Sequence, residues 1–288
     1  MINGYGKGIA PNGGLSFKPY LGIFKIRLVA GMQYRAAAWA GVATQFFWGA
    51  IQLIVFHAFY ESAGMNNAGA AAPMSFGQLA DFVWMRQAFL ALVMLWSMDN
   101  ELLELIASAN VAYELSRPLS LYTLWFSRIL AFRIARTLLR CIPIFIVAFL
   151  LPGSWGFHLP GDLQALILFI PSLVLAALLV TALSMIVCLL TFISLSPGGA
   201  RLFIGAAAEF LMGAAIPIPF MPPLLQRICF VLPFRYMADF PFRVYSGSII
   251  GTEALIGLGI QIFWLLALIG LGFWGFSAAL KRMVIQGG

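Results

Sequence analysis

Residues Leu163 to Leu195 read LQALILFIPSLVLAALLVTALSMIVCLLTFISL, a stretch without a single Asp, Glu, Lys or Arg. A helix needs about 20 mostly apolar residues to cross the hydrocarbon core of a bilayer, which is about 30 Å thick. At a rise of about 1.5 Å per residue, this stretch is long enough to cross the bilayer and protrude from it. We therefore predict a single membrane-spanning helix, with Pro171 near its outer end.

The rest of the chain has the same character. Of its 288 residues, 62% are hydrophobic and 9% are charged, whereas an ordinary soluble domain has about 25% charged residues. A water-soluble globule of this length would lack the polar side chains to cover its surface, which excludes a soluble enzyme and a disordered chain. The net charge of +7 does not indicate a nucleic-acid partner, because the basic residues separate apolar blocks instead of forming a patch. The composition predicts an all-α, polytopic membrane protein.

Five further blocks are apolar and long enough to cross a bilayer as helices. We predict six spans in all, which are Ala36–Tyr60, Gly77–Met98, Ile134–Leu151, Leu163–Leu195, Leu202–Ile218 and Leu255–Leu280. They form a transmembrane domain over residues 36–280, between an N-terminal part, 1–35, and a short tail, 281–288. An even number of spans puts both ends of the chain on one side of the membrane.

The basic residues decide which side this is. With six spans, 13 of the 17 Lys and Arg residues fall on the side of the two termini. Most of them lie in the N-terminal part and around the connection between the second and third spans. Positive charge is retained on the cytoplasmic side of a membrane. Both termini are therefore predicted to be cytoplasmic.

Two segments outside the spans are predicted to lie in the membrane interface. Residues 17–35 are apolar but carry basic side chains, which fits a helix at the cytoplasmic surface; a frayed leader is the alternative. Residues 217–253, on the outer side, hold six of the 15 prolines. Within them, Pro222–Leu232 is an apolar helix candidate that is too short to cross. We predict a re-entrant, proline-bounded element before the last span.

The connection 99–133, on the cytoplasmic side, is predicted to be helical rather than open. Asp99 is placed to cap a short helix. Pro118 ends any helix before it, and a second helix follows from Leu119. This pattern fits a segment that docks on a partner, while a solvated loop whose arginines only set the topology remains open. The second helix is expected to present three basic side chains on one face at the membrane surface, which are Arg133, Arg136 and Arg140.

No nucleotide-binding or catalytic motif occurs in the chain. It has no Gly-x-x-x-x-Gly-Lys-Ser/Thr loop, no His-Glu-x-x-His and no Gly-x-Ser-x-Gly. Two separated histidines, His57 and His158, and three cysteines in apolar surroundings, Cys141, Cys188 and Cys229, are expected to have packing roles. We expect neither a metal site nor catalysis by this chain.

Polar residues inside the predicted spans are the candidates for function, because lipid tolerates them poorly. Glu209 lies between two glycines at helical spacing, so it should face another helix, and Arg86 is the candidate partner. A structural Arg86–Glu209 pair is the simpler interpretation, and a contact with substrate is the other. Gln45 and Gln52 belong to a stripe on the first span that lines either a pathway or a subunit interface.

Several stretches resemble one family of membrane proteins. They are Tyr113-Glu114-Leu115-Ser116-Arg117-Pro118, the proline-rich run from Ile216 to Pro222, Leu232-Pro233-Phe234-Arg235-Tyr236, Tyr245-Ser246-Gly247, and the opening of the first span from Tyr34 to Trp48. The first is similar to a YELxRP motif found in a bacterial family of ABC-2-type (type V) ABC exporter permeases. The resemblance covers nearly the whole chain and carries no information about the cargo.

The resemblance implies a permease subunit in the bacterial inner (plasma) membrane. Two permeases, identical or different, would pack about a pseudo-two-fold axis above a dimer of cytoplasmic ABC ATPases. ATP and Mg²⁺ would be bound by that partner, and this chain would hold no cofactor. The resemblance assigns an outer gate to Phe220 and Phe234. It also assigns contact with the ATPase to a coupling region, with Glu101, Glu104, Tyr113, Glu114, Arg117 and Pro118 as candidates.

Other functions remain open at this stage. An ion-gradient-driven secondary transporter is the main alternative, although such proteins tend to have broken helices at matching places in both halves, and the proline-rich break is seen once here. An intramembrane enzyme and a purely structural membrane partner are further alternatives. The nearly uncharged spans suit an amphipathic or lipid-like cargo better than a small ion.

The predicted orientation can be tested by labelling. In a variant without its native cysteines, a cysteine introduced beside Glu114 is expected to lie in the cytoplasm, because the basic connection that holds it is retained there. A membrane-impermeant maleimide should therefore label it only after the cells are opened. Labelling in intact cells would contradict the topology.

Overall fold

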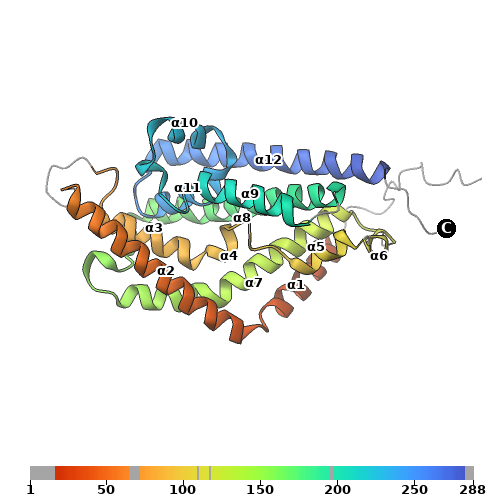
Figure 1. The fold of residues 1–288 in the computed structure, drawn as a ribbon, viewed down its shortest axis with the longest axis horizontal. Coiled ribbons are helices and arrows are strands. Elements are labelled where there is room, and N and C mark those ends of the chain that lie inside the picture. The colour runs from red at the N-terminus through yellow and green to blue at the C-terminus, as the bar shows by residue number, and fades with distance from the viewer. Residues whose placement is uncertain (1–16, 65–71, 109, 117, 195–196, 283–288) are drawn as a thin grey trace, which may run out of the picture.

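The computed structural model describes residues 17–64, 72–108, 110–116, 118–194 and 197–282. Every regular element in these ranges is a helix, and the long helices lie side by side in an elongated bundle (Figure 1). The α-helices are α1 (Lys18–Gly31), α2 (Arg35–Ser62), α3 (Phe76–Ala88), α4 (Leu90–Val93), α5 (Asn100–Ala107), α6 (Ala112–Leu115), α7 (Leu121–Leu150), α8 (Leu163–Ser194), α9 (Pro197–Leu211), α10 (Pro223–Val231), α11 (Asp239–Tyr245) and α12 (Gly251–Arg282). Short 3₁₀ turns are η1 (Gly153–Trp155), η2 (Ile218–Phe220) and η3 (Pro233–Met237).

Among the described residues, three helices are long and apolar enough to cross a membrane: α2, α8 and α12. They correspond to the predicted first, fourth and sixth spans. The stretch from Leu163 forms one continuous helix through Pro171, as predicted, up to Ser194. Of the most apolar 18-residue stretch of α8, 67% is buried inside the protein. The corresponding share is 22% in α2 and 28% in α12. Helix α8 is thus the centre of the bundle. Helices α2 and α12 have apolar faces on the outside of the bundle.

The other three predicted spans differ from single apolar helices. The second, predicted over Gly77–Met98, is an irregular helix in two pieces, α3 and α4, and its helical part ends at Val93. The third begins earlier than predicted, since α7 runs through the arginine-bearing connection from Leu121. The fifth was predicted to reach Ile218, but α9 ends at Leu211. Two residues later Gly213 has a φ of 75°, a left-handed conformation that commonly ends a helix.

The shorter predicted elements agree better with the structure. The segment 17–35 contains α1, which has no buried residue and packs along α7. Gly31 allows this contact, because a Cβ there would lie 2.7 Å from the Cβ of Ala135. Asp99 caps α5 as predicted, accepting a hydrogen bond from the backbone N–H of Leu102 at 3.3 Å. Helix α10, Pro223–Val231, lies within its predicted range.

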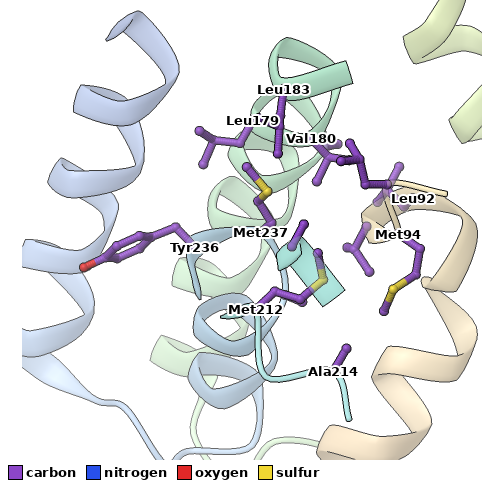
Figure 2. Packing of buried hydrophobic residues seen from close by; sticks show 14 of the residues in the cluster. Leu92, Met94, Leu179, Val180, Leu183, Met212, Ala214, Tyr236 and Met237 are labelled. Carbon is purple, nitrogen blue, oxygen red and sulfur yellow. The ribbon is translucent and has the colours of Figure 1, made fainter. Parts of the chain in front are cut away.

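The core is packed around α8. Helices α5, α7, α9, α11 and α12 and the turn η3 all contact it. Figure 2 shows Leu179, Val180 and Leu183 of α8 facing a region where Met212 and Met237 meet. Flexible methionine side chains fill irregular gaps well. They lie here at places where helices end inside the protein instead of at its surface.

Arg133 is the largest difference between the expected and the observed environment of a side chain. It was predicted to lie at the membrane surface with Arg136 and Arg140, but it is completely buried. Its Nη1 donates hydrogen bonds to the carbonyl oxygens of Ala91, Leu92 and Met94 at 3.4, 3.3 and 2.8 Å. Its Nη2 donates to Ser184 Oγ at 2.8 Å.

The reason for this burial is the interior end of α4. The last carbonyl groups of a helix have no donors within the helix, and buried backbone groups without a partner are costly. Because α4 ends at Val93 inside the bundle, water does not supply the donors. Arg133 of α7 supplies these donors, so one guanidinium group satisfies the carbonyl groups at the end of the neighbouring helix α4.

Substitution of Arg133 by Met should therefore destabilise the protein strongly. It leaves the carbonyl oxygens of Ala91, Leu92 and Met94 without a donor, and each buried acceptor that loses its partner costs about 1–3 kcal/mol. We expect the free energy of unfolding to fall by about 3 kcal/mol, measured by thermal or denaturant unfolding in detergent. Arg35→Met, which replaces an exposed arginine at the start of α2, is the control and should change stability little. Equal stability of the two variants would contradict the capping role.

Candidate functional site

A cavity of about 850 Å³ opens on the side of the bundle between α2, α3 and α9. All four polar residues singled out within the predicted spans line it, and so does one of the two predicted gate residues. Those five residues are Gln45, Gln52, Arg86, Glu209 and Phe220. The remaining lining is largely aromatic and aliphatic, with Trp48, Phe56, Phe59 and Trp96 among its members. The cavity thus combines a few polar groups with a wide apolar wall, as ligand sites commonly do.

The two glutamines face the cavity because of the spacing along α2. Gln45 and Gln52 are seven residues apart, which is about two helical turns, so they share one face. Gly49 lies between them on the same face. A Cβ at this position would lie 2.8 Å from the ring of Trp84, so the missing side chain lets α2 lie directly against α3. The small residue sets the distance between the two helices that form the cavity.

Arg86 connects the segments that line the cavity, and it does so through hydrogen bonds instead of an ion pair. Its Nη2 donates to Gln52 Oε1 at 2.5 Å, and its Nη1 donates to the carbonyl oxygen of Ala214. Gln52 Nε2 donates in turn to the carbonyl oxygen of Ala215 at 3.3 Å. Both carbonyl groups belong to the irregular segment after α9. Arg86 and Gln52 therefore fasten that segment to α3 and α2.

The predicted pairing of Arg86 with Glu209 is not a direct contact. Both residues line the cavity, but no N–O distance of 4.0 Å or less joins them among the ion pairs of the described residues. Glu209 is exposed. The sequence pattern placed both groups at one site and missed the backbone carbonyl groups that Arg86 binds, because the end of α9 was predicted seven residues too late.

Gln45 differs from the other polar residues of the cavity. Its side chain is 3% exposed, and neither its amide nitrogen nor its amide oxygen has a hydrogen-bond partner among the described residues. Burying an amide without a partner is unfavourable. Within the described part of the chain, the amide of Gln45 therefore stands unpaired in the cavity wall, with both of its polar atoms covered by neighbouring atoms.

The two predicted gate residues lie in different surroundings. Phe220 packs against Phe56, Phe59 and Tyr60 of α2, with ring centroids 6.0, 6.2 and 6.1 Å away. This aromatic cluster closes one end of the cavity. Phe234 is half-buried in η3, packs on the main core and does not line the cavity. The structure therefore does not bring Phe220 and Phe234 together.

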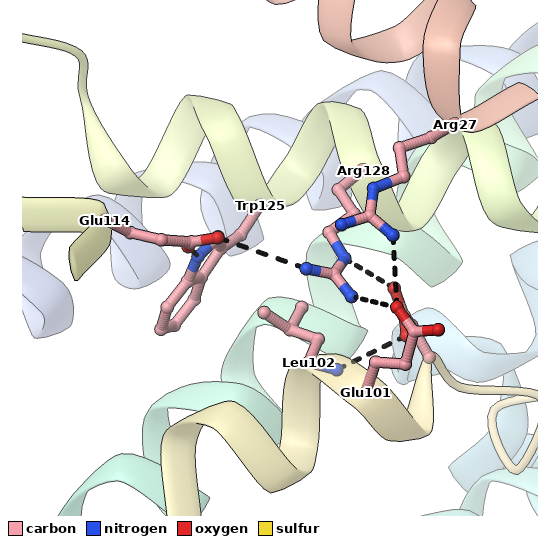
Figure 3. Close-up of polar contacts among 7 residues, drawn as sticks. Arg27, Glu101, Leu102, Glu114, Trp125 and Arg128 are labelled. Carbon is pink, nitrogen blue, oxygen red and sulfur yellow. Dashed lines mark hydrogen bonds and ion pairs between the residues drawn. The ribbon is translucent and has the colours of Figure 1, made fainter. Parts of the chain in front are cut away.

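At one end of the bundle, Arg128 is the centre of an ionic cluster that Figure 3 shows in close-up. Its Nε donates to Asp99 Oδ2 at 2.6 Å, and its Nη2 donates to Glu101 Oε2 at 3.1 Å. Glu101 also pairs with Arg27 of α1 at 3.1 Å. Glu114 lies 4.0 Å from Arg128 and accepts a hydrogen bond from the indole of Trp125. The cluster therefore links α1, the α5–α6 segment and α7.

This cluster changes the interpretation of the predicted coupling residues. Glu101 and Glu114 have partners within the chain, whereas the exposed side chain of Glu104 has no hydrogen bond or ion pair with another described residue. Pro118 is exposed. Arg117 lies outside the described residues, as does the side chain of Tyr113. Sequence reasoning treated Arg128 only as a topological charge. The acidic residues of the same connection, Asp99, Glu101 and Glu114, were the signal that it had ion-pair partners.

A second ionic cluster lies in the proline-rich segment before α12. Asp239 is completely buried, with Arg235 and Arg243 at 3.3 and 3.6 Å. Burial raises the pKa of Asp239 above its ordinary value, while the two guanidinium groups oppose that rise. Arg235 also lies over the ring of Phe230 of α10, 3.8 Å from its centroid. These contacts fix α10, η3 and α11 to one another.

The chain matches no protein-family model, and no curated protein is significantly similar to it. Its chemistry must therefore be inferred from its own residues. Among the described residues, no group of three His, Cys, Asp or Glu side chains could hold a metal ion. The three cysteines are free and buried. His57 packs between Phe76 and Trp155, and the ring of His158 lies 3.1 Å from Asp81.

The ionic cluster can be tested with a pair of substitutions at Asp99. Asp99→Asn keeps a capping side chain but removes the charge that faces buried Arg128, and we expect it to lower the free energy of unfolding by about 3 kcal/mol. Asp99→Ala also removes the cap and should cost about 1 kcal/mol more. Glu104→Gln, a neutralisation on the exposed side of the same helix, should change it by less than about 0.5 kcal/mol. Denaturant unfolding in detergent measures all three, and three equal values would contradict the cluster's role.

Proposed function

We propose that this chain is the membrane-spanning permease subunit of an ATP-driven ABC-2-type exporter. In this proposal it crosses a bacterial inner membrane six times, forms half of a translocation pathway with a second permease, and couples to a separate dimer of ABC ATPases. ATP and Mg²⁺ belong to those partners. The observation that carries the proposal is the lateral cavity, where four polar side chains predicted to avoid lipid converge against an aromatic wall.

Six crossings require α3–α4, α7 and α9 in addition to the three long apolar helices. Eleven residues of α3 are buried, including Asp81 and Arg86, so neighbouring helices shield its polar groups from lipid. The 30 residues of α7 extend about 45 Å. The 15 residues of α9 extend only about 22 Å, so the irregular segment after it completes the crossing. Irregular backbone is tolerated at membrane depth when protein satisfies it, and Arg86 and Gln52 do so here.

The arrangement of the bundle supports a common side for the two ends of the chain. Figure 1 shows α5, α6 and the C-terminal end of α12 at one end of the molecule and α10 near the other. The ionic cluster joins α1 to the first of these ends. With the excess of basic residues on that side, the positive-inside rule makes it cytoplasmic.

The same end offers a route for coupling. Helix α5 buries Leu102, Leu103 and Ile106 against the bundle and leaves Glu104 exposed. Arg128 ties α5 to α7, whose C-terminal part is the proposed third crossing. A displacement of α5 by a bound ATPase would therefore be transmitted to α7 through the buried ion pair of Asp99 and Arg128.

One observation favours the second candidate, an ion-gradient-driven secondary transporter. Such transporters often contain helices broken at membrane depth in both halves. The sequence indicated one break, in the second half, but α4 also ends inside the bundle in the first half. The two functions differ in their energy source, so the partner that accompanies the chain separates them.

Stoichiometric co-purification of a P-loop ATPase is the test of the proposed function. The tagged chain is extracted from its native membrane in a mild detergent, and the ATPase that accompanies it is quantified. Glu104→Lys should lower the yield at least about fivefold, because it reverses an exposed charge at the proposed contact without removing an internal bond. Glu61→Lys, at the far end of α2, is the control and should retain the ATPase. Proton-coupled uptake by the chain without any ATPase would overturn the proposal and support the second candidate.

A further inference from the structure

A second, smaller cavity of about 340 Å³ lies where α1, α2, α5 and α7 meet, apart from the lateral cavity. Its charged lining consists of Arg27, Asp99, Glu101, Arg136 and Arg140. Within this set Glu101 is paired with Arg27, and Asp99 is paired with Arg128 just outside the cavity. Arg136 and Arg140 remain, and neither forms an ion pair with a described residue. Two positive charges therefore share a pocket in which no described carboxylate lies within 4.0 Å of either one, although the charge of Asp99 acts on Arg136 from a greater distance.

The surroundings orient both guanidinium groups. That of Arg136 lies over the ring of Phe132, 4.2 Å from its centroid. That of Arg140 lies against Gly41 of α2, where a Cβ would come within 2.5 Å of Arg140 Cζ. The Nε of Arg140 is buried and has no hydrogen-bond partner in the described part of the chain. Because Arg140 Nε is covered, the donors that can reach a ligand are the terminal nitrogens of the two guanidinium groups, and such arginine donors suit phosphate oxygens.

Apolar side chains lead away from the pocket along the outside of the bundle. Tyr34 and Trp39, at the start of α2, are 70% and 65% exposed, as is typical of aromatic residues at a membrane–water boundary. Beyond Arg140, Ile142 and Ile146 of α7 are 60% and 57% exposed. An acyl chain can follow this surface while a charged headgroup occupies the pocket.

We infer that this pocket binds the phosphate group of an anionic phospholipid between Arg136 and Arg140. The inference rests on the proposed function only for the position of the pocket at the cytoplasmic boundary of the membrane. The two arginines would hold the phosphate oxygens, and Tyr34 and the exposed isoleucines of α7 would contact the glycerol and acyl portions. The bound lipid would join α2 to α1, α5 and α7, the helices that the ionic cluster already links.

The test measures lipid retention by the purified full-length chain. Native mass spectrometry and thermal unfolding in detergent are carried out with added phosphatidylglycerol, with phosphatidylcholine of the same acyl chains, or with glycerol 3-phosphate. We expect phosphatidylglycerol to bind at least about tenfold more tightly than phosphatidylcholine. Both lipids carry a phosphodiester, but the quaternary ammonium group of phosphatidylcholine is repelled by the two guanidinium groups. Equal protection by glycerol 3-phosphate would overturn the lipid and assign the phosphate site to a soluble compound.

Two double variants separate the pocket from general surface charge. Arg136→Gln with Arg140→Gln should weaken phosphatidylglycerol binding at least about tenfold, whereas Arg136→Lys with Arg140→Lys should recover part of it. Lys25→Gln with Arg35→Gln removes two exposed charges near the same end but outside the pocket and should leave binding within about twofold. Wild-type binding by the first variant, or an equal loss in the last, overturns the inference. Neither readout needs an ATPase, so this result is independent of the co-purification test.

Discussion

Backbone carbonyl groups at interior helix ends must find donors within the protein, and two arginines provide them. Arg133 of α7 binds the carbonyl oxygens at the end of α4, and Arg86 of α3 binds that of Ala214 after α9. Each of these helices stops inside the bundle, where water cannot replace the missing partners. The long guanidinium side chains reach from one helix to the end of another, so the broken helices and the continuous ones depend on each other. The lateral cavity is located at one of the two breaks.

The use of arginine without a carboxylate partner fits this setting. A buried ion pair requires both charges to lose their hydration, and its net contribution is often small. A guanidinium that donates to several neutral carbonyl oxygens meets many acceptors with one charge. The paired carboxylates lie instead toward the two ends of the helical bundle. One group surrounds Arg128, and the other is at Asp239. The middle of the bundle is thereby kept nearly free of negative charge, with Glu209 at the open side of the cavity.

The sequence predicted the long apolar helices well and the interior breaks poorly. Length and hydrophobicity alone identified α2, α8 and α12, because a run of apolar residues with few charges has few alternatives to a helix of that length. The same reasoning extended α3–α4 and α9 too far, since the residues that follow Val93 and Leu211 are still largely apolar. Hydropathy does not predict where a helix ends when the carbonyl groups at that end accept hydrogen bonds from a side chain distant in sequence. Gln45, Gln52, Arg86 and Glu209, which line the lateral cavity, were identified from the sequence because a polar residue within an apolar span must avoid lipid. The hydrogen bonds of Arg86 and Gln52 to the carbonyl groups of Ala214 and Ala215 were not predicted, because the positions of those backbone atoms depend on the break after α9.

Gly49 has a consequence for how such a cavity could diversify. The close approach of α2 to the ring of Trp84 depends on the absence of a single side chain. A methyl group there would press on Trp84 and on Gln87 Cγ, so it would move one wall of the cavity outward and shift Gln45 and Gln52 with it. The width of the opening, and so the size of molecule it admits, is therefore adjustable at one inert position, independently of the chemistry that recognises what enters.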